Sequence, residues 1–120
     1  MAPLAVLAAA LVSGPPPAYV ATPTGQVPLA VSAWCWKTRC GAPIAASKRV
    51  AVVRRGSTVR VELRFAPRSV SVYVNGIRAA TTTRGREIAW TAARGGGLTV
   101  RASSSTGWVT YVGRLRLRAG

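Results

Sequence analysis

Residues 57–76 read STVRVELRFAPRSVSVYVNG, and this stretch decides the fold class. It contains two runs of alternating apolar and polar residues, 59–65 and 70–74, joined by the short turn sequence APRS. Side chains along a β-strand point alternately to opposite faces, so each run places its valine, leucine and phenylalanine side chains on one face. The stretch therefore predicts two strands at the centre of a small antiparallel β-domain.

Similar runs lie on both sides of this stretch. The predicted strands are, in order, residues 27–36, 50–53, 59–65, 70–74, 81–83, 88–90, 98–103 and 108–119. In the first of them, Leu29, Val31 and Ala33 are expected to share one face. The dipeptide Asn75-Gly76 predicts a tight turn, because both residues tolerate positive φ. No helical periodicity follows residue 25, so the pattern favours an all-β sandwich.

A series of motifs adds a family resemblance. The motifs are RGSTVRVELRF, APRSVSVYV, a lone Trp90, GGLTVRAS and GWVTYVGRLRL. Their order, over about residues 48–118, resembles the immunoglobulin-like β-sandwich modules of small secreted bacterial proteins. Those modules often carry Tyr where this chain has Leu98. The resemblance implies an immunoglobulin-like or fibronectin-III-like antiparallel sandwich of about seven strands and an extracytoplasmic setting, and it transfers no catalytic residues.

The chain begins with an apolar run at residues 4–12, which has the length of a signal-peptide core and is too short to cross a bilayer. Small residues at Ser13, Gly14 and Ala18 are candidates for a cleavage site. No Lys or Arg precedes the run, so two alternatives stay open: a true start further upstream, or a buried N-terminal helix or strand.

The chain is expected to divide into three segments. Residues 1–18 form a signal-peptide-like segment, residues 19–26 belong to a linker rich in Pro, Gly and Thr, and residues 27–120 form the β-sandwich. Once the signal segment is removed, no transmembrane span is expected. We therefore predict a protein that is secreted or held at the cell envelope.

Cys35 and Cys40 are the two cysteines of the chain, and in an exported protein they predict a disulfide. Four residues separate them, which excludes the two-residue spacing of a redox motif. Two thiols with no His and no Asp in the chain cannot complete a tetrahedral zinc site. We predict a local staple and neither a metal nor a cofactor.

Trp34 and Trp36 flank Cys35 and are candidate contacts for a ligand, since aromatic rings beside Lys37 and Arg39 suit stacking on a sugar or a base. The alternative interpretation is structural. In that case at least one of the two rings covers the disulfide or closes an end of the sandwich.

The charge of the chain is strongly positive. It contains 17 Lys and Arg against Glu62 and Glu87 alone, which gives a net charge of +15. Such a surface attracts polyanions, with anionic cell-wall polymer, acidic polysaccharide, nucleic acid and anionic lipid as candidate partners. The alternative is that Arg is abundant because the coding sequence is rich in GC.

The last predicted strand carries Arg114, Arg116 and Arg118 on one face at a spacing of ~6.8 Å, which suits contact with successive anionic groups. The alternative is a sheet edge kept soluble by charge. Further candidate contacts with a polyanion are Arg60, Arg64 and Arg101.

These observations favour a non-enzymatic protein with a structural or binding role at the cell envelope, and a polyanion binder is the alternative. No pattern for specific nucleic-acid recognition or for a phosphate loop is present. A catalytic pair of Glu62 and Glu87 is the remaining enzymatic hypothesis, but alternation places Glu62 on a solvent-facing side between two arginines. A membrane-active role is disfavoured, since no basic amphipathic helix is expected.

Overall fold

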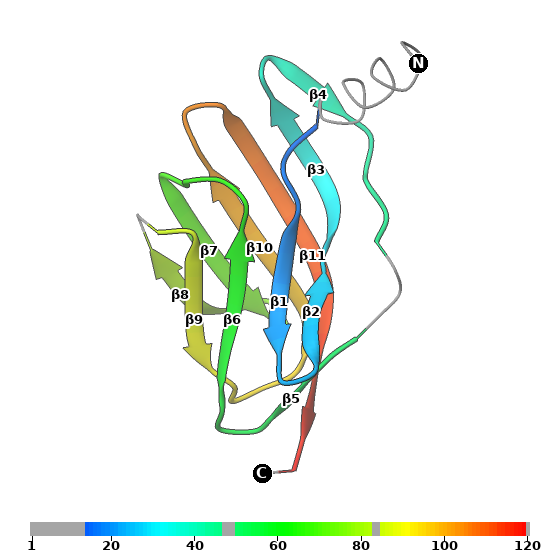
Figure 1. Ribbon diagram of the computed structural model, residues 1–120, viewed down its shortest axis with the longest axis vertical. Coiled ribbons are helices and arrows are strands. Elements are labelled where there is room, and N and C mark those ends of the chain that lie inside the picture. Colours follow the sequence, from blue (N-terminus) through cyan, green and yellow to red (C-terminus); the bar gives the residue numbers. More distant parts are fainter. Residues whose placement is uncertain (1–13, 47–49, 83–84, 120) are drawn as a thin grey trace.

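The computed structural model describes residues 14–46, 50–82 and 85–119, which form two β-sheets packed face to face (Figure 1). The predicted signal run falls in residues 1–13 and lies outside the described residues. No helix in the described ranges has the length and apolar character needed to span a membrane. The strands are β1 (Ala18–Thr22), β2 (Gly25–Pro28), β3 (Ala30–Trp36), β4 (Arg39–Gly41), β5 (Ala51–Arg54), β6 (Thr58–Leu63), β7 (Ser69–Val74), β8 (Ile77–Thr82), β9 (Glu87–Thr91), β10 (Gly96–Ser103) and β11 (Gly107–Arg118).

The strand order identifies the type of sandwich. The four-stranded sheet has the order β2-β1-β6-β9, and the seven-stranded sheet has the order β4-β3-β11-β10-β7-β8, with β5 also paired to β11. Without β2 to β5, the first, second and fifth strands of the chain form one sheet, and the third, fourth, sixth and seventh form the other. The constant-type immunoglobulin sandwich has the same distribution, except that its fourth strand lies in the sheet of the first, second and fifth. The predicted fold class is confirmed, and β2 to β5 are additional strands inserted between its first and second.

The two runs that predicted the fold lie in opposite sheets, as β6 and β7. Their apolar side chains meet in the core, where Val59, Val61, Val72 and Val74 are fully buried. Burying each such side chain contributes roughly 1.5–3 kcal/mol. The predicted Asn75-Gly76 turn is confirmed: φ is 52° at Asn75 and 81° at Gly76, and the flanking residues of β7 and β8 are paired.

The N-terminal boundary differs from the prediction. Residues 19–26, expected as a linker, belong largely to the hairpin of β1 and β2, and Val20 is fully buried opposite Val61. The hydroxyl of Tyr111 donates a hydrogen bond to the carbonyl of Pro16 at 2.6 Å. The sandwich therefore includes residues well before position 27. The prediction failed because the Pro, Gly and Thr content of this segment obscures a short apolar alternation.

A β-bulge changes the orientation of side chains in β3. Val31 is paired with Tyr111 and Ala33 with Thr110, so Ser32 is an extra residue on β3. The extra residue inverts the alternation. Ala33, expected on the same face as the buried Val31, is consequently exposed.

Candidate functional site

The predicted arginines of β11 lie together on the outer face of the seven-stranded sheet. Arg114, Arg116 and Arg118 are all exposed, and they alternate with inward-facing Leu115 and Leu117. β5 runs parallel to β11 and places Arg54 directly beside Arg118. We call Arg54, Arg114, Arg116 and Arg118 the arginine ridge.

The arginine ridge is not explained by protection of a sheet edge along its whole length. β11 pairs with β10 through Leu115 on one side, and with β3 and then β5 on the other. Only the last residues of β11 extend past β10. An open recess of about 540 Å³ lies beside the ridge, between the chain at Gly95 and the side chains of Arg55, Arg114 and Arg116.

Arg60 and Arg64 do not join the arginine ridge, because they lie with the opposite sheet. Arg60 is on β6 and forms an exposed ion pair with Glu87, with 3.5 Å between Nε and Oε1. Arg64 stacks over the ring of Tyr19 at 4.9 Å and donates a hydrogen bond to Gln26 at 3.2 Å. The predicted set of arginines is thus divided between the two faces of the molecule.

Arg101 belongs to the same face as the arginine ridge, but to a different part of it. Its guanidinium lies 5.4 Å from the ring centre of Tyr73, and that of Arg78 lies 5.8 Å from it. Arg78 also donates a hydrogen bond to the Tyr73 hydroxyl at 3.4 Å. This hydrogen bond, together with the charges of Arg78 and Arg101, holds the pKa of Tyr73 below its ordinary value.

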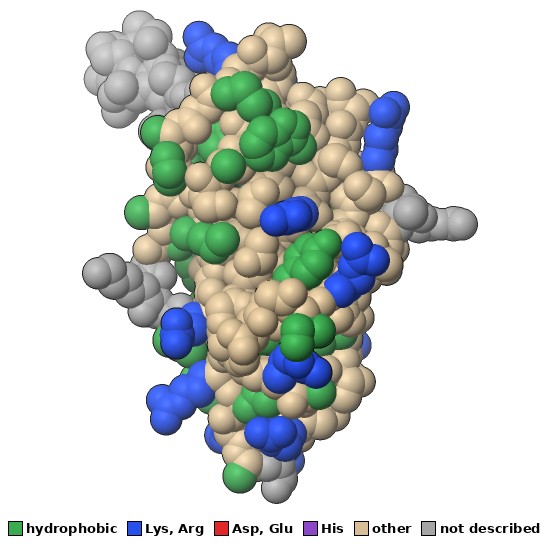
Figure 2. Space-filling model, turned by 180° about the vertical axis from the view of Figure 1, so that it is seen from behind, with side chains coloured by type: hydrophobic (Ala, Val, Ile, Leu, Met, Phe, Trp, Pro, Cys, Tyr) green, Lys and Arg blue, Asp and Glu red, His purple; other side chains and the backbone are tan. Residues whose placement is uncertain are grey.

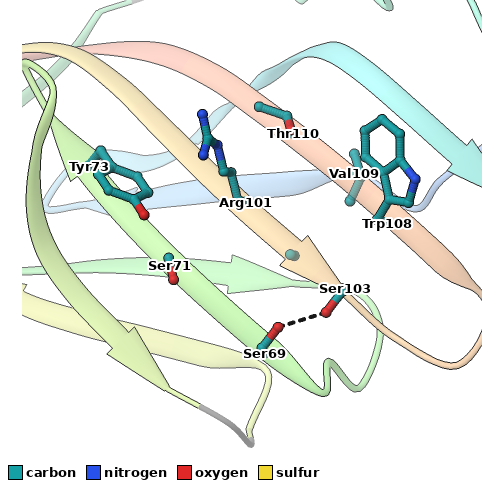
Figure 3. A pocket seen from close by; sticks show the side chains of 9 residues that line it. Ser69, Ser71, Tyr73, Arg101, Ser103, Trp108, Val109 and Thr110 are labelled. Atoms are coloured by element: carbon teal, nitrogen blue, oxygen red, sulfur yellow. Dashed lines mark hydrogen bonds between the residues drawn. The ribbon is translucent and has the colours of Figure 1, made fainter.

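An open recess of about 260 Å³ extends from Tyr73 across β10 to the start of β11 (Figure 3). Arg101 lies between Tyr73 and Thr110, and Trp108 lies beyond Thr110, closer to the start of β11. The rest of the lining combines the hydroxyl groups of serine and threonine with two small apolar residues, and the hydroxyls of Ser69 and Ser103 are hydrogen-bonded at 2.6 Å. We call this site the Trp108 recess. Its lining residues are Ser69, Ser71, Tyr73, Arg101, Ala102, Ser103, Trp108, Val109 and Thr110.

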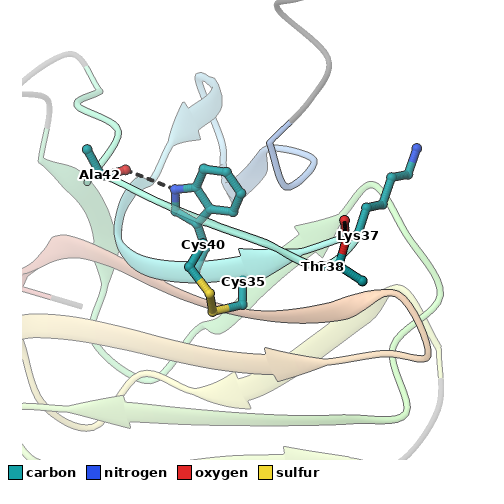
Figure 4. Close-up of a disulfide and its surroundings, with 6 residues drawn as sticks. Cys35, Lys37, Thr38, Cys40 and Ala42 are labelled. Carbon is teal, nitrogen blue, oxygen red and sulfur yellow. Dashed lines mark hydrogen bonds between the residues drawn. A yellow bond between two sulfur atoms is a disulfide. The ribbon is translucent and has the colours of Figure 1, made fainter.

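The predicted disulfide is confirmed, and one of its cysteines is paired with Trp108 in the sheet. Cys35 and Cys40 occupy paired positions of β3 and β4 (Figure 4). Cys35 is also paired with Trp108 of β11, so the disulfide and the indole are neighbours in the same sheet. The Trp108 side chain is 44% exposed, which leaves much of its ring open to solvent.

The tryptophans proposed as ligand contacts have structural positions. Trp36 is 5% exposed and packs edge-on against the ring of Phe65, with 5.0 Å between ring centres. Trp34 is half-buried against the core, and its Nε1–H donates to the Ala42 carbonyl at 2.9 Å. Both rings point inward because the bulge in β3 inverts the alternation of side chains after Ser32. Stacking of a ligand on Trp36 is therefore excluded, whereas the half-buried Trp34 also lines an open recess of about 470 Å³.

Charge is distributed unequally over the two faces. The only acidic side chains of the sequence, Glu62 and Glu87, are paired across β6 and β9 of the four-stranded sheet. Glu62 accepts a hydrogen bond from Gln26, and Glu87 pairs with Arg60. The outer face of the seven-stranded sheet carries no side-chain carboxylate, and Figure 2 shows that side of the molecule with Lys and Arg along its length and no acidic side chain in view. Its arginines are Arg54, Arg78, Arg101, Arg114, Arg116 and Arg118.

Several residues of this face were missed from sequence. Arg54 and Arg78 join it only through pairing with β11 and β7, which no local pattern reveals. The place of Trp108 on this face could have been predicted, because residues 108, 114 and 116 are an even number of positions apart on one strand and therefore point to the same side. Within the described ranges, no group of three or more His, Cys, Asp or Glu side chains could hold a metal ion.

Comparisons with known proteins give little similarity. No family model matches the chain, and no curated protein matches it. Among solved structures, the neutron crystallographic structure of a lytic polysaccharide monooxygenase from Jonesia denitrificans is similar with a TM-score of 0.45 and 9% identity. The match covers 61% of this chain and 61% of that one, so the chain spans less than two thirds of the neighbour.

Proposed function

We propose that this protein is an extracytoplasmic β-sandwich without enzymatic activity that binds an anionic polymer of the cell envelope, such as an acidic polysaccharide. The outer face of the seven-stranded sheet is the binding surface. The observation that carries the proposal is the unequal distribution of charge: both acidic side chains lie with the four-stranded sheet, while the opposite face carries unbalanced arginines.

The geometry of the arginine ridge suits a polymer better than a small anion. Arg114, Arg116 and Arg118 repeat at ~6.8 Å along one strand, so a chain of anionic units can contact several of them at once. Each single contact at an exposed site is weak. Several contacts along one polymer add together and release condensed counterions, which makes the binding steeply dependent on salt.

Two features support a location outside the cytoplasm. The Cys35–Cys40 disulfide is a type of bond that persists in oxidising compartments. The apolar run at residues 4–12 has the length of a signal-peptide core. The mass of the mature protein recovered from the culture medium of the native host tests both. We expect a chain that starts at or before Pro16, whose carbonyl accepts a hydrogen bond from Tyr111. Its mass should be lower by two hydrogen atoms than that of the reduced form. An unprocessed, reduced chain found only in the cytosol would contradict the proposal.

The absence of enzymatic activity is supported by the environment of the carboxylates. Glu62 and Glu87 are on the surface of the four-stranded sheet, each engaged by a neighbour, and neither faces the recesses described above. Incubation of the protein with a polysaccharide should leave the chain length of the polymer unchanged, as measured by size-exclusion chromatography. Shortened chains would contradict this part of the proposal.

The binding surface is tested with polygalacturonate, a polymer with one carboxylate per sugar. The triple variant Arg114→Gln, Arg116→Gln, Arg118→Gln should bind it at least tenfold more weakly than the wild type at low salt. The matched control is Arg60→Gln, Arg64→Gln, which removes charge from the opposite face and should change the affinity less than twofold. Losses of binding free energy in proportion to the number of arginines removed, three in one variant and two in the other, would show a general charge effect and would overturn the assignment of the surface.

A further inference from the structure

The Trp108 recess lies on the same face as the arginine ridge but has a different composition. The arginine ridge offers charge alone, whereas the recess combines an exposed indole, a guanidinium and several hydroxyl groups. We propose that the Trp108 recess binds one acidic sugar residue of the polymer, with the sugar ring stacked on Trp108 and its carboxylate bound by Arg101. This inference rests on the proposed function and adds the class of ligand to it.

Trp108 provides the stacking surface. At the start of β11 its side chain is on the solvent side of the sheet, while its neighbour Val109 is in the core. Trp108 is 44% exposed, and its indole therefore presents a flat apolar surface to solvent. The disulfide on the paired position of β3 fixes the strand beside the indole, so little order is lost when a ring stacks on it.

Arg101 provides the carboxylate contact. Its guanidinium rests on the ring of Tyr73 at 5.4 Å, and no acidic side chain lies on this face to neutralise it. A cation–π contact engages no N–H group as a hydrogen-bond donor, so the guanidinium keeps its N–H groups for bidentate binding of a carboxylate. Arg78, on the same tyrosine, adds a second positive charge at this end of the recess.

Hydroxyl groups complete the match to a sugar. Ser69, Ser103 and Thr110 line the recess between the indole and Tyr73, and a hydroxyl both donates and accepts hydrogen bonds. The volume of about 260 Å³ lies below the roughly 300–1,000 Å³ of sites for drug-sized ligands, and therefore suits one sugar ring rather than a large ligand.

A single-stranded nucleic acid fits the recess less well. Proteins that bind such strands stack successive bases on successive aromatic rings. Here the ring of Tyr73 is already covered by Arg78 and Arg101, which leaves Trp108 as the aromatic surface of the recess.

The position of the recess also suits a polymer. Trp108 and Arg114 have the same orientation on β11 and are six residues apart, which corresponds to about 20 Å along the strand. A polymer with one sugar in the recess can therefore continue along β11 to the arginine ridge.

The test uses trigalacturonate, a trimer too short to reach from the recess to the far end of the arginine ridge, and calorimetry of the full chain. We expect the wild type to bind the trimer at least tenfold more tightly than its uncharged methyl ester. Trp108→Ala and Arg101→Gln should each weaken binding of the trimer roughly tenfold, and Trp108→Phe should retain most of it. The ridge triple variant and the control Arg60→Gln, Arg64→Gln should bind the trimer within twofold of the wild type. Thermal unfolding of each variant confirms that it is folded.

The outcomes separate this inference from the proposed function. Unchanged binding of the trimer in both Trp108→Ala and Arg101→Gln would overturn the recess assignment, as would equal affinity for the methyl ester. If polygalacturonate binding still falls in the ridge variant, the proposed function stands without the recess. If the recess variants no longer bind the trimer while the ridge variant binds the polymer normally, the arginine ridge is not the polymer-binding surface. The assignment of the Trp108 recess as a sugar site is then retained. Tighter binding of oligothymidylate than of the trimer, lost in Trp108→Ala, would overturn the choice of a sugar.

Discussion

Tyr111 ties the segment before β1 to the opposite sheet through one hydroxyl group. Its side chain is fully buried, and the hydroxyl donates to the carbonyl of Pro16 at 2.6 Å. Burial raises the pKa of Tyr111 well above its ordinary value, because the anion would be desolvated in the core.

The raised pKa makes stability depend on alkaline pH. Above about pH 10 the unfolded chain releases the Tyr111 proton while the folded chain retains it, so the free energy of unfolding falls as pH rises. We expect Tyr111→Phe to cost about 1 kcal/mol at pH 8 through the lost hydrogen bond, and to lose less stability than the wild type between pH 8 and pH 11. Urea denaturation at the two pH values measures this. An equal fall in both proteins would show that Tyr111 does not titrate as argued.

Lys37 and Thr38 form the turn between β3 and β4 in a backbone conformation that suits neither. Their φ angles are 50° and 63°, and for a β-branched residue such as Thr38 a positive φ is a strained conformation. Thr38→Gly should therefore stabilise the protein by about 0.5–1 kcal/mol, since relief of strain exceeds the added entropy of the unfolded chain.

Thermal unfolding checks the Thr38→Gly prediction as a rise of a few degrees in Tm. The matched control is Gly76→Ala, at a turn position where φ is 81° and glycine already occurs. This control should lower Tm. A lower Tm for Thr38→Gly as well would mean that the Thr38 side chain contributes more than the turn conformation costs.

At the scale of elements, β3 and β4 depend on their disulfide. β4 has only three residues, all exposed, and it pairs with β3 at the edge of the seven-stranded sheet. A loop of this length stabilises the fold by about 2 kcal/mol in the chain-entropy model. Cys35→Ser, Cys40→Ser should lower the free energy of unfolding by that amount and should also loosen the strand beside Trp108.

Guanidinium denaturation and trigalacturonate binding measure the two consequences separately. A stability loss without a change in affinity would mean that β11 holds Trp108 without help from the disulfide. No loss of stability would show that β4 is held by other contacts, such as the hydrogen bond from Trp34 to Ala42.

The predictability of each element follows from where its information lies. β6, β7, β10 and β11 were predicted because an apolar period of two is visible within each strand. The face predicted for Ala33 was wrong because the bulge in β3 is set by pairing with β11, which the local sequence does not show. β1 and β2 were missed because proline and glycine in a short edge hairpin have the same composition as a linker.

The residues of the candidate site also fall into those that the local sequence predicts and those that only the pairing of distant strands brings together. The arginines of β11 share a strand, so local alternation was enough to group them. Arg54, Arg78 and Tyr73 come from β5, β8 and β7, and only the non-local register brings them to the same face. Arg60 and Arg64 lie with the other sheet, which the sequence could not show because the pattern of a strand does not reveal which sheet it joins.

At the scale of the whole molecule, the sandwich separates charge. One outer face carries both acidic side chains of the sequence, Glu87 paired with Arg60 and Glu62 hydrogen-bonded to Gln26, and the other carries arginines without a carboxylate. A net charge of +15 alone would attract polyanions to any surface. The separation instead predicts that attraction acts mainly from one side.

The salt dependence of polygalacturonate binding tests this claim most directly. The affinity is measured between 50 and 200 mM NaCl for the wild type, for Arg114→Gln, Arg116→Gln, Arg118→Gln, and for Arg60→Gln, Arg64→Gln. Fewer contacts release fewer counterions, so the account predicts a clearly shallower dependence for the triple variant and an unchanged one for the double variant. A slope that falls in proportion to the number of arginines removed, whichever face they come from, would contradict it.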